Sequence, residues 1–506
     1  MNRAAAVMML LLPAACAPKS CSPEKRVTQL VFGTTTEPAS IDPAFASDAA
    51  SQELARLAYL ELTEHDDAWR VVPRLAAAVP EAETSTAGMT VRWRLRPGYG
   101  WSDGAAITGA DVVFAHGIEA DDQLDTPNHD VARRASIRAG EGGFEVTWDQ
   151  PFADFAAPKV HAVLPAHAGP KPSGAAFAGV ARTSAPASGP YRLTQWVPGQ
   201  HAIFEPNPHF GGTRPTIERI VYRFFPSEDA LEAELVAGGV DAVGEASGLG
   251  LERVQNLASQ LEPTHVVEYA DSGLMLHLSP NLAHPLLARV EVRRAIFSAV
   301  DRDALCALVY GPRARPATGF YPPRHPGHVE AAFAPEAPPL ATLVEGADPI
   351  RLEYMSGSQA SARAAAFVAD ALKKGGLATE LSAAPPAVVM KHLRESPAPL
   401  TLLAFRWRPD WDGASALTKG GTRNFTGYAD PEVAESLTRA QTTVDPTAWG
   451  DHLRTVERLF RRDLPLLPLA YRPAVSVRPK RLKGWRPTGT TTPVTWNAEA
   501  WRLTSD

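Results

Sequence analysis

The loop that follows the predicted strand 400–405 carries the side chains best suited to hold an organic ligand. It reads Arg406-Trp407-Arg408-Pro409-Asp410-Trp411-Asp412-Gly413. Open α/β sheets bind ligands beyond the carboxyl ends of their strands, and aromatic walls with a few oriented charges suit a zwitterion. A buried carboxylate would pair with an ammonium group, and an arginine with a carboxylate. The alternative is a surface turn with Asp412-Gly413 at its corner and Asp410 capping local backbone N–H groups.

No residue pattern typical of catalysis or of a cofactor is present. The sequence lacks G-x-S-x-G, H-E-x-x-H and the glycine-rich phosphate loops. The letters S-x-x-K at residues 22–25 fall in a polar segment where no pocket could orient them. We therefore expect no catalytic residue and no cofactor.

A metal site is not predicted either. His325 and His328 could chelate a metal, but no third ligand is nearby and both are predicted to be surface residues of a loop. Cys16 and Cys21 lie near the N-terminus, and Cys306 lies in an apolar helical stretch, so it is predicted to be buried. None of the three cysteines has metal-ligand spacing.

The elements that must position the loop alternate between strands and helices. Alternating or apolar runs predict strands at 29–33, 90–96, 144–148, 217–225, 240–243, 350–355, 377–381 and 400–405. Helices are predicted after Thr108 (with Asp111 completing a capping box), over 227–236, in two pieces of 291–309 split at Asp301, over 358–374, and after Asp430 and Asp445. This order indicates an α/β fold, and 506 residues suggest about three domains.

Residues 1–15 are predicted to be a signal peptide. Arg3 is followed by an apolar run over 4–12, which is shorter than the ~20 residues needed to span a bilayer. Ala14 and Ala15 precede Cys16 as at a bacterial lipoprotein cleavage site, so Cys16 is a lipidation candidate. Pro13 stands where such sites usually have an aliphatic residue, and a plain secretory signal cut nearby is the alternative. Both alternatives place the protein outside the cytoplasm, in the periplasm or cell envelope.

The overall charge disfavours nucleic-acid binding. The chain has 50 Lys+Arg and 56 Asp+Glu, a net charge of -6. A general nucleic-acid binder needs an excess of cations to displace phosphate counterions. Apolar residues at 45% and charged residues at 21% are ordinary for a soluble globular protein.

Several short motifs are spread along nearly the whole chain. The most specific is the segment W-S-D-G at residues 101–104, continued by I-T at 107–108 and D-V-V-F at 111–114. The others are E-P-A-S-I-D-P (37–43), S-G-P-Y (188–191), N-P-H-F-G-G (207–212), V-R-R-A (292–295) with D-R (301–302), and D-L-P with P-L (463–469). In this order the motifs resemble those of the extracytoplasmic solute-binding proteins of family 5, the oligopeptide- and dipeptide-binding type of bacterial ABC transporters.

This resemblance implies a type II periplasmic-binding-protein-like α/β fold. Two lobes would be joined by a two-stranded hinge, with an extra α+β domain inserted in the first lobe, and ligand would bind between the closing lobes. The implied division is a tether at 16–26, the first lobe at 27–70, 186–277 and 478–506, the inserted domain at 71–185, and the second lobe at 278–477.

The resemblance also implies a ligand site. Trp407 to Trp411 matches the family's W-x-x-D-[YWN] segment, whose aspartate pairs with the ligand's α-ammonium group, so Asp410 takes that role. Ligand backbone is expected near the loop of Ser47, Asp48 and Ala49, although Pro409 removes one backbone donor. Arg406 or Arg408 could meet a ligand carboxylate or be solvated. Tyr471 could line the cleft or belong to the core.

The predicted function is a substrate-binding receptor that captures peptides and delivers them to ABC permease subunits, acting as a monomer without metal or nucleic acid. One alternative is a receptor of the same family for a nickel chelate, a sugar or haem. A secreted peptide-binding chaperone or sensor is a second alternative, and a secreted hydrolase is a third.

Overall fold

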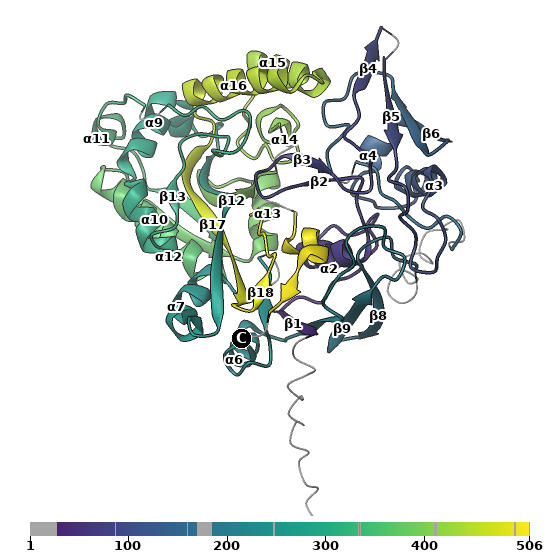
Figure 1. Cartoon of the computed structure of the whole chain (residues 1–506). Coiled ribbons are helices and arrows are strands. Elements are labelled where there is room, and N and C mark those ends of the chain that lie inside the picture. Colours follow the sequence, from purple (N-terminus) through teal and green to yellow (C-terminus); the bar gives the residue numbers. More distant parts are fainter. Residues whose placement is uncertain are drawn as a thin grey trace, which may run out of the picture.

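The computed structural model describes residues 28–86, 88–158, 160–168, 185–245, 248–331, 333, 335–408, 412–489 and 492–504. Among these residues one large mixed sheet runs through both halves of the molecule (Figure 1). Its strand order is β15 (Thr379–Ala384), β14 (Ile350–Met355), β16 (Leu400–Arg406), β12 (His265–Pro280), β17 (Leu467–Pro479), β11 (Ala242–Val243), β1 (Gln29–Thr34), β10 (Arg219–Phe224), β9 (His201–Pro206) and β8 (Tyr191–Val197), with β13 (Arg315–Pro316) beside β17.

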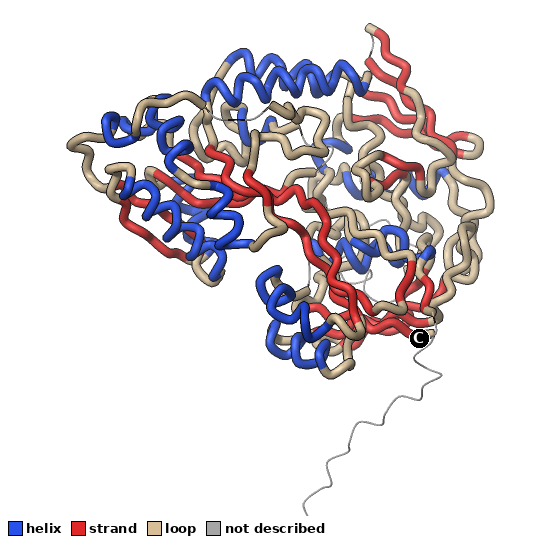
Figure 2. Tube along the Cα trace, turned by 60° about the vertical axis from the view of Figure 1, so that its left-hand side comes forward, coloured by secondary structure: helices blue, strands red, loops and turns tan. Residues whose placement is uncertain are grey.

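Two long antiparallel strands, β12 and β17, connect the two halves of the sheet. Residues 274–280 of β12 pair with β16, whereas Val477 of β17 pairs with Val243 of β11. The register between the two strands is interrupted between Ala270 and Leu274, where the ribbon passes from one lobe to the other. Figure 2 shows the ribbon as the long strands that run between the lobes. We call the β1 side the first lobe and the β16 side the second lobe.

The first lobe packs helices against parallel strands. β1 pairs in parallel with both β10 and β11. The helices are α2 (Ala49–Ala58), α6 (Glu228–Val236), α7 (Leu251–Leu261) and the C-terminal 3₁₀ segment η2 (Val494–Ala500). Phe32 stacks on Tyr222 with ring centroids 4.6 Å apart, and also on Trp485 and Trp501. Aromatic stacking of this kind adds roughly 0.5–1.5 kcal/mol per pair to area burial.

The apolar core of the second lobe is continuous with buried residues of α6, α7 and β11 of the first lobe. β14 pairs in parallel with β15 and β16. Asp301 caps α10 by accepting a hydrogen bond from the Ala304 amide, which confirms the predicted break in the helical stretch. The helices are α8 (Pro285–Ala288), α9 (Val290–Ala299), α10 (Arg302–Tyr310), α11 (Leu340–Leu343), α12 (Gln359–Lys374), α13 (Pro386–Glu395), α14 (Ala414–Leu417), α15 (Pro431–Thr442) and α16 (Pro446–Asp463).

A separate four-stranded sheet forms the body inserted in the first lobe. Its order is β4 (Ala82–Ser85), β5 (Gly88–Arg94), β7 (Gly143–Trp148) and β6 (Ala135–Gly140), flanked by α3 (Gly109–Glu119) and α4 (His129–Ala132). Trp93 pairs with Phe144 across β5 and β7, as the alternating patterns predict. The Thr108–Asp111 capping box at the start of α3 is confirmed. A short hairpin, β2 (Thr63–His65) and β3 (Val71–Pro73), lies beside this body.

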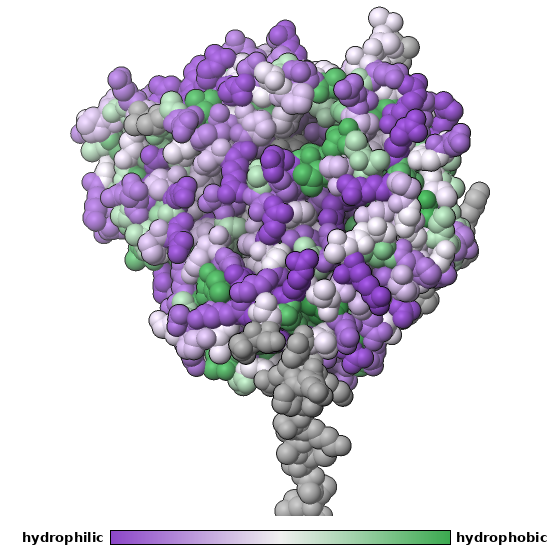
Figure 3. All heavy atoms as spheres, viewed as in Figure 1, coloured by the Kyte–Doolittle hydropathy of each residue, from purple (hydrophilic) through white to green (hydrophobic). Residues whose placement is uncertain are grey.

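The model confirms the α/β, type II periplasmic-binding-protein-like fold. The sequence patterns did not predict β12 and β17; β17 is a nearly continuous buried run, and β12 is half-buried over 266–270 and mostly buried from 272 on. The described residues contain no helix long and apolar enough to cross a bilayer. The surface viewed in Figure 3 is mostly hydrophilic, with apolar side chains in small separate patches. Residues 1–27, including the lipidation candidate Cys16, lie outside the described part of the chain.

Candidate ligand-binding site

The carboxyl ends of parallel strands from both lobes meet at a groove between the lobes. On the first-lobe side, β10 leads into α6 and β11 leads into α7; on the second-lobe side, β14 leads into α12. The groove has a volume of about 810 Å³. It is lined by residues from 227–232 and 250–256 of the first lobe, and by Val309, Tyr310, residues 357–360 and Arg472 of the second lobe and the ribbon. Its position agrees with the rule that ligands of open α/β sheets bind beyond the strand ends.

Direct contacts join the two lobes beside this groove. The Gln255 side-chain amide on α7 donates to the carbonyl of Tyr310 at the end of α10, at 2.8 Å. Arg363 on α12 and Glu252 on α7 form an ion pair at 3.0 Å. The lobes therefore touch in this form of the protein, as two lobes closed over a ligand would.

Two arginines lie side by side on the sheet at the junction. Arg406 ends β16 and Arg472 lies on β17, and both are in register with Leu274 of β12, which runs between them. Directly opposed residues of neighbouring strands project to the same face of a sheet. Burial lowers the pKa of each arginine, and the charge of Arg472 lowers the pKa of Arg406 further. Arg406, a predicted site residue, is thus at the junction between the lobes.

The first lobe places the carboxyl group of Glu245 near Arg406, and that of Glu53 near Glu245. Glu245 follows β11, and burial together with the charge of Glu53 raises the pKa of Glu245 to about 8, while Arg406 and a backbone N–H of Gly489 oppose that rise. Glu53 on α2 is buried and accepts a hydrogen bond from the Tyr222 hydroxyl at 3.1 Å. Glu245 is therefore largely protonated at neutral pH in this form, and Arg406 keeps most of its charge uncompensated.

Trp407 is fully buried, so in this form its ring is part of the second-lobe core and not a wall of the groove. It packs edge-on against Phe320, with ring centroids 4.5 Å apart, and against Tyr321 and His325. Its backbone N–H donates to the Gly273 carbonyl of β12 at 2.7 Å. A Cβ atom at Gly273 would lie 2.4 Å from the Trp407 carbonyl oxygen, so only glycine allows this close approach.

Two further residues singled out in the sequence, Tyr471 and His325, lie at the same aromatic cluster. Tyr471 is buried, and its hydroxyl donates to the carbonyls of Gly319 (3.0 Å) and Tyr321 (3.2 Å), while its edge reaches a small hollow beside Arg472. The prediction that His325 lies at the surface is wrong: it is buried and stacks on Tyr321 with ring centroids 4.6 Å apart. A loop rich in proline and glycine suggested exposure, but aromatic packing determined the burial of this side chain.

The other predicted site residues are exposed. Arg408 is exposed next to Trp407, and Ser47, Asp48 and Ala49 form an exposed helix start. The Asp48 side chain caps α2 by accepting from the Ser51 amide at 2.8 Å.

The predicted turn at Asp412-Gly413 is present. Gly413 has φ 88°, and the Asp412 carboxylate accepts hydrogen bonds from the Ala414 amide and the Gln441 side chain. Asp410 and Trp411, with Pro409, lie outside the described residues, so their expected roles remain predictions.

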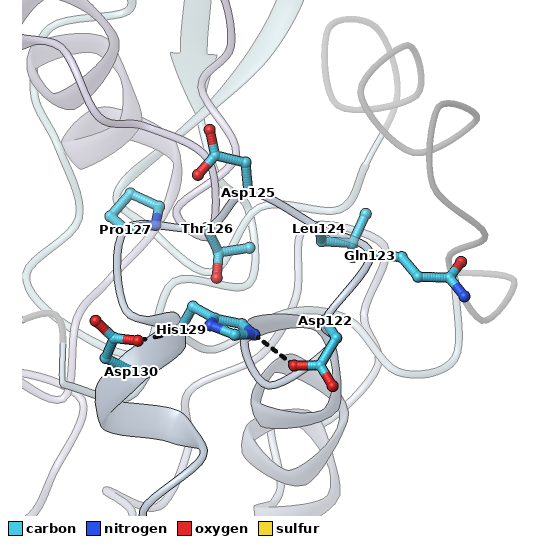
Figure 4. A pocket seen from close by; sticks show the side chains of 8 residues that line it. All are labelled: Asp122, Gln123, Leu124, Asp125, Thr126, Pro127, His129 and Asp130. Carbon is cyan, nitrogen blue, oxygen red and sulfur yellow. Dashed lines mark hydrogen bonds and ion pairs between the residues drawn. The ribbon is translucent and has the colours of Figure 1, made fainter.

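Another hollow lies in the inserted domain, far along the chain from the predicted site. Figure 4 shows His129 between Asp122 and Asp130, while Asp125 and Gln123 point away. His129 Nε2 lies 3.2 Å from an Asp122 carboxylate oxygen. Within the described residues no group of three or more His, Cys, Asp or Glu could hold a metal ion. This hollow therefore gives no reason to move the site away from the lobe junction.

Sequence reasoning missed Glu245, Glu53 and Arg472. Glu245 could have been found, because it lies two residues after the predicted strand at 240–243, much as Arg406 comes directly after the predicted strand at 400–405. Arg472 could not, because β17 was not recognised as a strand and its register with β16 was unknown.

Two α/β lobes joined by a two-stranded ribbon, with charged groups at their junction, define a two-lobed solute-binding protein. Residues 70–424 match the family described as bacterial extracellular solute-binding proteins, family 5 Middle. The chain belongs to this family.

Curated relatives extend over most of the chain. This chain is 26% identical over 471 residues to Protein XP55 of Streptomyces lividans, and the alignment covers 86% of this chain and 82% of that protein. It is 23% identical over 507 residues to the oligopeptide-binding protein OppA of Bacillus subtilis (strain 168), covering 91% and 90% respectively.

Solved structures share the fold at low identity. The periplasmic EDTA-binding protein EppA matches with a TM-score of 0.81 and 18% identity, covering 94% of this chain and 97% of that one. The oligopeptide-binding protein AppA from Bacillus subtilis, in complex with a nonapeptide, matches with a TM-score of 0.73 and 18% identity, covering 94% and 99%.

Proposed function

We propose that this protein is the extracytoplasmic receptor of a peptide ABC importer, which captures peptides between its lobes and delivers them to membrane permease subunits. The observation that carries the proposal is the charged junction between two lobes that meet at their strand ends. A relative that binds oligopeptides and a neighbour of the same fold that holds a nonapeptide support it. The receptor binds and releases its ligand without making or breaking a bond.

Ligand would act by stabilising the closed form more than the open one. A ligand shifts a conformational equilibrium only by its differential affinity for the two states. The contacts of Gln255 with Tyr310 and of Arg363 with Glu252 form only when the lobes approach, so they add to the stability of the closed form. The register break at Ala270–Leu274 is the natural place for the ribbon to bend. This bend is our proposed boundary between the lobes within the ribbon.

Asp410 is the proposed partner of the peptide's α-ammonium group. The proposal rests on the match of residues 407–411 to the family segment and on the loop's place after β16. Trp411 and Arg408 are proposed to line the same subsite, and the loop of Ser47, Asp48 and Ala49 to face the ligand backbone. Removing one partner of a buried ion pair costs about 3–5 kcal/mol, which is roughly two to three decades of affinity.

The decisive experiment is calorimetric titration of the mature protein with peptides of two to nine residues. We expect saturable binding of at least one length, and a loss of at least a hundredfold in affinity in Asp410→Asn. Asp451→Asn, an exposed change on α16, is the matched control and should bind like wild type. Equal affinities in Asp410→Asn and wild type would refute the Asp410 assignment, and no binding of any peptide would refute the proposed function.

The proposed attachment is a lipid on Cys16, with residues 16–26 as a tether to a monomeric body. Mass spectrometry of the mature N-terminus should show a diacylglyceryl mass on a chain that begins at Cys16. An unmodified N-terminus elsewhere would show a plain secreted protein. Size-exclusion chromatography with light scattering tests the monomer against the mass of 54.2 kDa for the full chain.

A further inference from the structure

Arg406 and Arg472 have no partner of opposite charge that would explain their burial. No hydrogen bond or ion pair links either guanidinium to a residue in the described part of the chain, and the Nε of Arg472 is buried without any hydrogen-bond partner. The two side chains are partly buried on one face of the sheet, on either side of Leu274. A guanidinium taken out of water without a partner is costly, and two like charges side by side add repulsion.

Two other buried arginines differ, because each has charged or backbone partners, although the Nη2 of Arg56 also lacks a hydrogen-bond partner. Arg56 forms ion pairs with Glu61 (2.6 Å) and Glu64 (2.5 Å). Arg293 donates to the carbonyls of Leu287, Ala288 and Leu464 at 2.8–3.0 Å. The lack of partners at Arg406 and Arg472 is therefore a local feature, and such departures from the packing rules are expected at functional sites.

The carboxyl groups nearby do not neutralise this pair. Glu245 faces Arg406, but burial favours its protonated form, and one of its oxygens has no hydrogen-bond partner in the described structure. Tyr310 lies near enough to act on Arg472, but burial raises the pKa of its hydroxyl, so it stays neutral. Neither guanidinium therefore forms an ion pair with a carboxylate of the described residues in this form.

Arg472 is also open to the space where a ligand can enter. It lines the groove between the lobes and a second, smaller hollow of about 40 Å³, whose other charged residues are Arg313, Arg315, Arg324 and Asp271, with Asp271 ion-paired to Arg324 at 3.4 Å. A water molecule needs ~10–15 Å³ of such space, so this hollow has room for a small polar group.

We propose that Arg406 and Arg472 form a carboxylate subsite of the receptor, which binds an anionic group of the ligand when the lobes close. Guanidinium forks bind carboxylates through two parallel hydrogen bonds, and the ligand charge would replace the missing counter-ion. The ligand class is a carboxylate-bearing solute: a peptide through its C-terminal carboxylate or an acidic side chain, or a polycarboxylate chelator. A peptide as the carboxylate-bearing ligand rests on the proposed function, whereas a chelator as that ligand does not.

The test compares Arg472→Met and Arg406→Met with Arg351→Met, an exposed arginine of β14 in the same sheet. Each protein is titrated calorimetrically with a peptide bearing a free C-terminus, with its C-terminal amide, and with EDTA. We expect the wild type and Arg351→Met to prefer the free acid over the amide, or to bind EDTA. In Arg472→Met and Arg406→Met, the preference for the free acid over the amide, or the affinity for EDTA, should fall at least tenfold. Arg472→Lys, which keeps the charge without the planar fork, should recover part of it.

A second readout separates this role from a purely structural one. Removing a buried charge that lacks a partner should raise the melting temperature of the ligand-free protein in Arg472→Met. A fall in melting temperature with ligand preference unchanged would overturn the proposal, as would a wild type that binds neither carboxylate probe. Binding of EDTA without any peptide would leave the subsite standing and refute the peptide receptor. Equal binding of the free acid and the amide by the wild type, with peptide affinity intact, would refute the carboxylate subsite and leave the peptide receptor standing.

Discussion

Glu119 on α3 shows how burial controls the protonation of single residues in this protein. Its carboxyl group is buried and accepts a hydrogen bond from the Asn128 side chain at 2.9 Å. Burial raises its pKa from an ordinary 4.5 to about 8. The folded protein therefore holds this proton at pH values where the unfolded chain has released it, and the contribution of Glu119 to stability falls as the pH rises from about 4.5 to 8.

This linkage predicts the behaviour of Glu119→Gln. The amide cannot ionise, so the variant should gain stability relative to wild type as the pH rises from 6 to 8, by about 1–2 kcal/mol. Buried histidines act in the opposite direction in this range, because burial lowers the pKa of His161 to about 3 and that of His277 to about 4. The comparison at each pH by urea denaturation removes their common effect. Parallel profiles for the two proteins would contradict the raised pKa.

Trp407 makes a second residue-scale prediction. Because its ring is fully buried against Phe320 and Tyr321, Trp407→Ala should lower the free energy of unfolding by about 3–5 kcal/mol. Leu308→Ala on α10, where the side chain is 53% exposed, is the control and should change it by no more than about 0.5 kcal/mol. Chemical denaturation measures both. A cost below about 1 kcal/mol for Trp407→Ala would instead fit a ring that faces the ligand groove.

At the scale of elements, four helices of the second lobe, α10, α12, α15 and α16, begin at a side chain that accepts a hydrogen bond from the first turn. α16 is the longest helix among the described residues, and it starts at Asp445, whose carboxylate accepts from the Ala448 amide at 2.8 Å. Pro446 occupies the first helical position, where its missing N–H has no cost. One face of α16 buries Leu453, Val456 and Phe460 against the core.

Loss of this cap should be measurable. Asp445→Ala should lower stability by about 1 kcal/mol, since it leaves an amide of the first turn without its acceptor. Asp451→Ala removes a carboxylate of the same helix that forms only an exposed ion pair with Arg454, so it should cost about 0.5 kcal/mol or less. Thermal denaturation of the two variants side by side provides the measurement. Equal shifts in both would show that the cap contributes nothing beyond its charge.

At the scale of the whole molecule, function depends on the balance between open and closed lobes. Gln255→Ala with Arg363→Ala removes both polar contacts between the lobes beside the groove without touching the charged junction. The open form should become more populated, so small-angle scattering should report a larger radius of gyration for the ligand-free double variant. Ligand affinity should fall severalfold, because part of the binding free energy is then used for closure.

Arg439→Ala is a suitable control for this experiment. It removes an exposed ion pair with Glu435 inside α15 and should change neither the scattering nor the affinity. An unchanged radius of gyration in the double variant would mean that these contacts do not help to hold the lobes together.

Local sequence signals determined the elements of this protein, and in some places their pairing. The caps at Ser227, Asp301, Asp430 and Asp445, the alternation of β5 and β7, and the buried run of β16 act through neighbours a few residues away, so they can be read from the chain. The resemblance of several short motifs added the two-lobed architecture. The loop at 406–413 was recognised as chemically rich for the same local reason.

Only the tertiary structure decided which side chains of that loop face a ligand and which support it. Trp407 is a residue type that suits the wall of a ligand site, but its ring is buried in the core, whereas Arg406 lies at the junction. Arg472 comes beside Arg406 through the pairing of β16 and β17 with β12. The physical reason is that burial and charge proximity depend on contacts between residues far apart in the chain. β12 and β17 are shared by both lobes, and neither shows the regular alternation of buried and exposed residues that would reveal those contacts in the sequence.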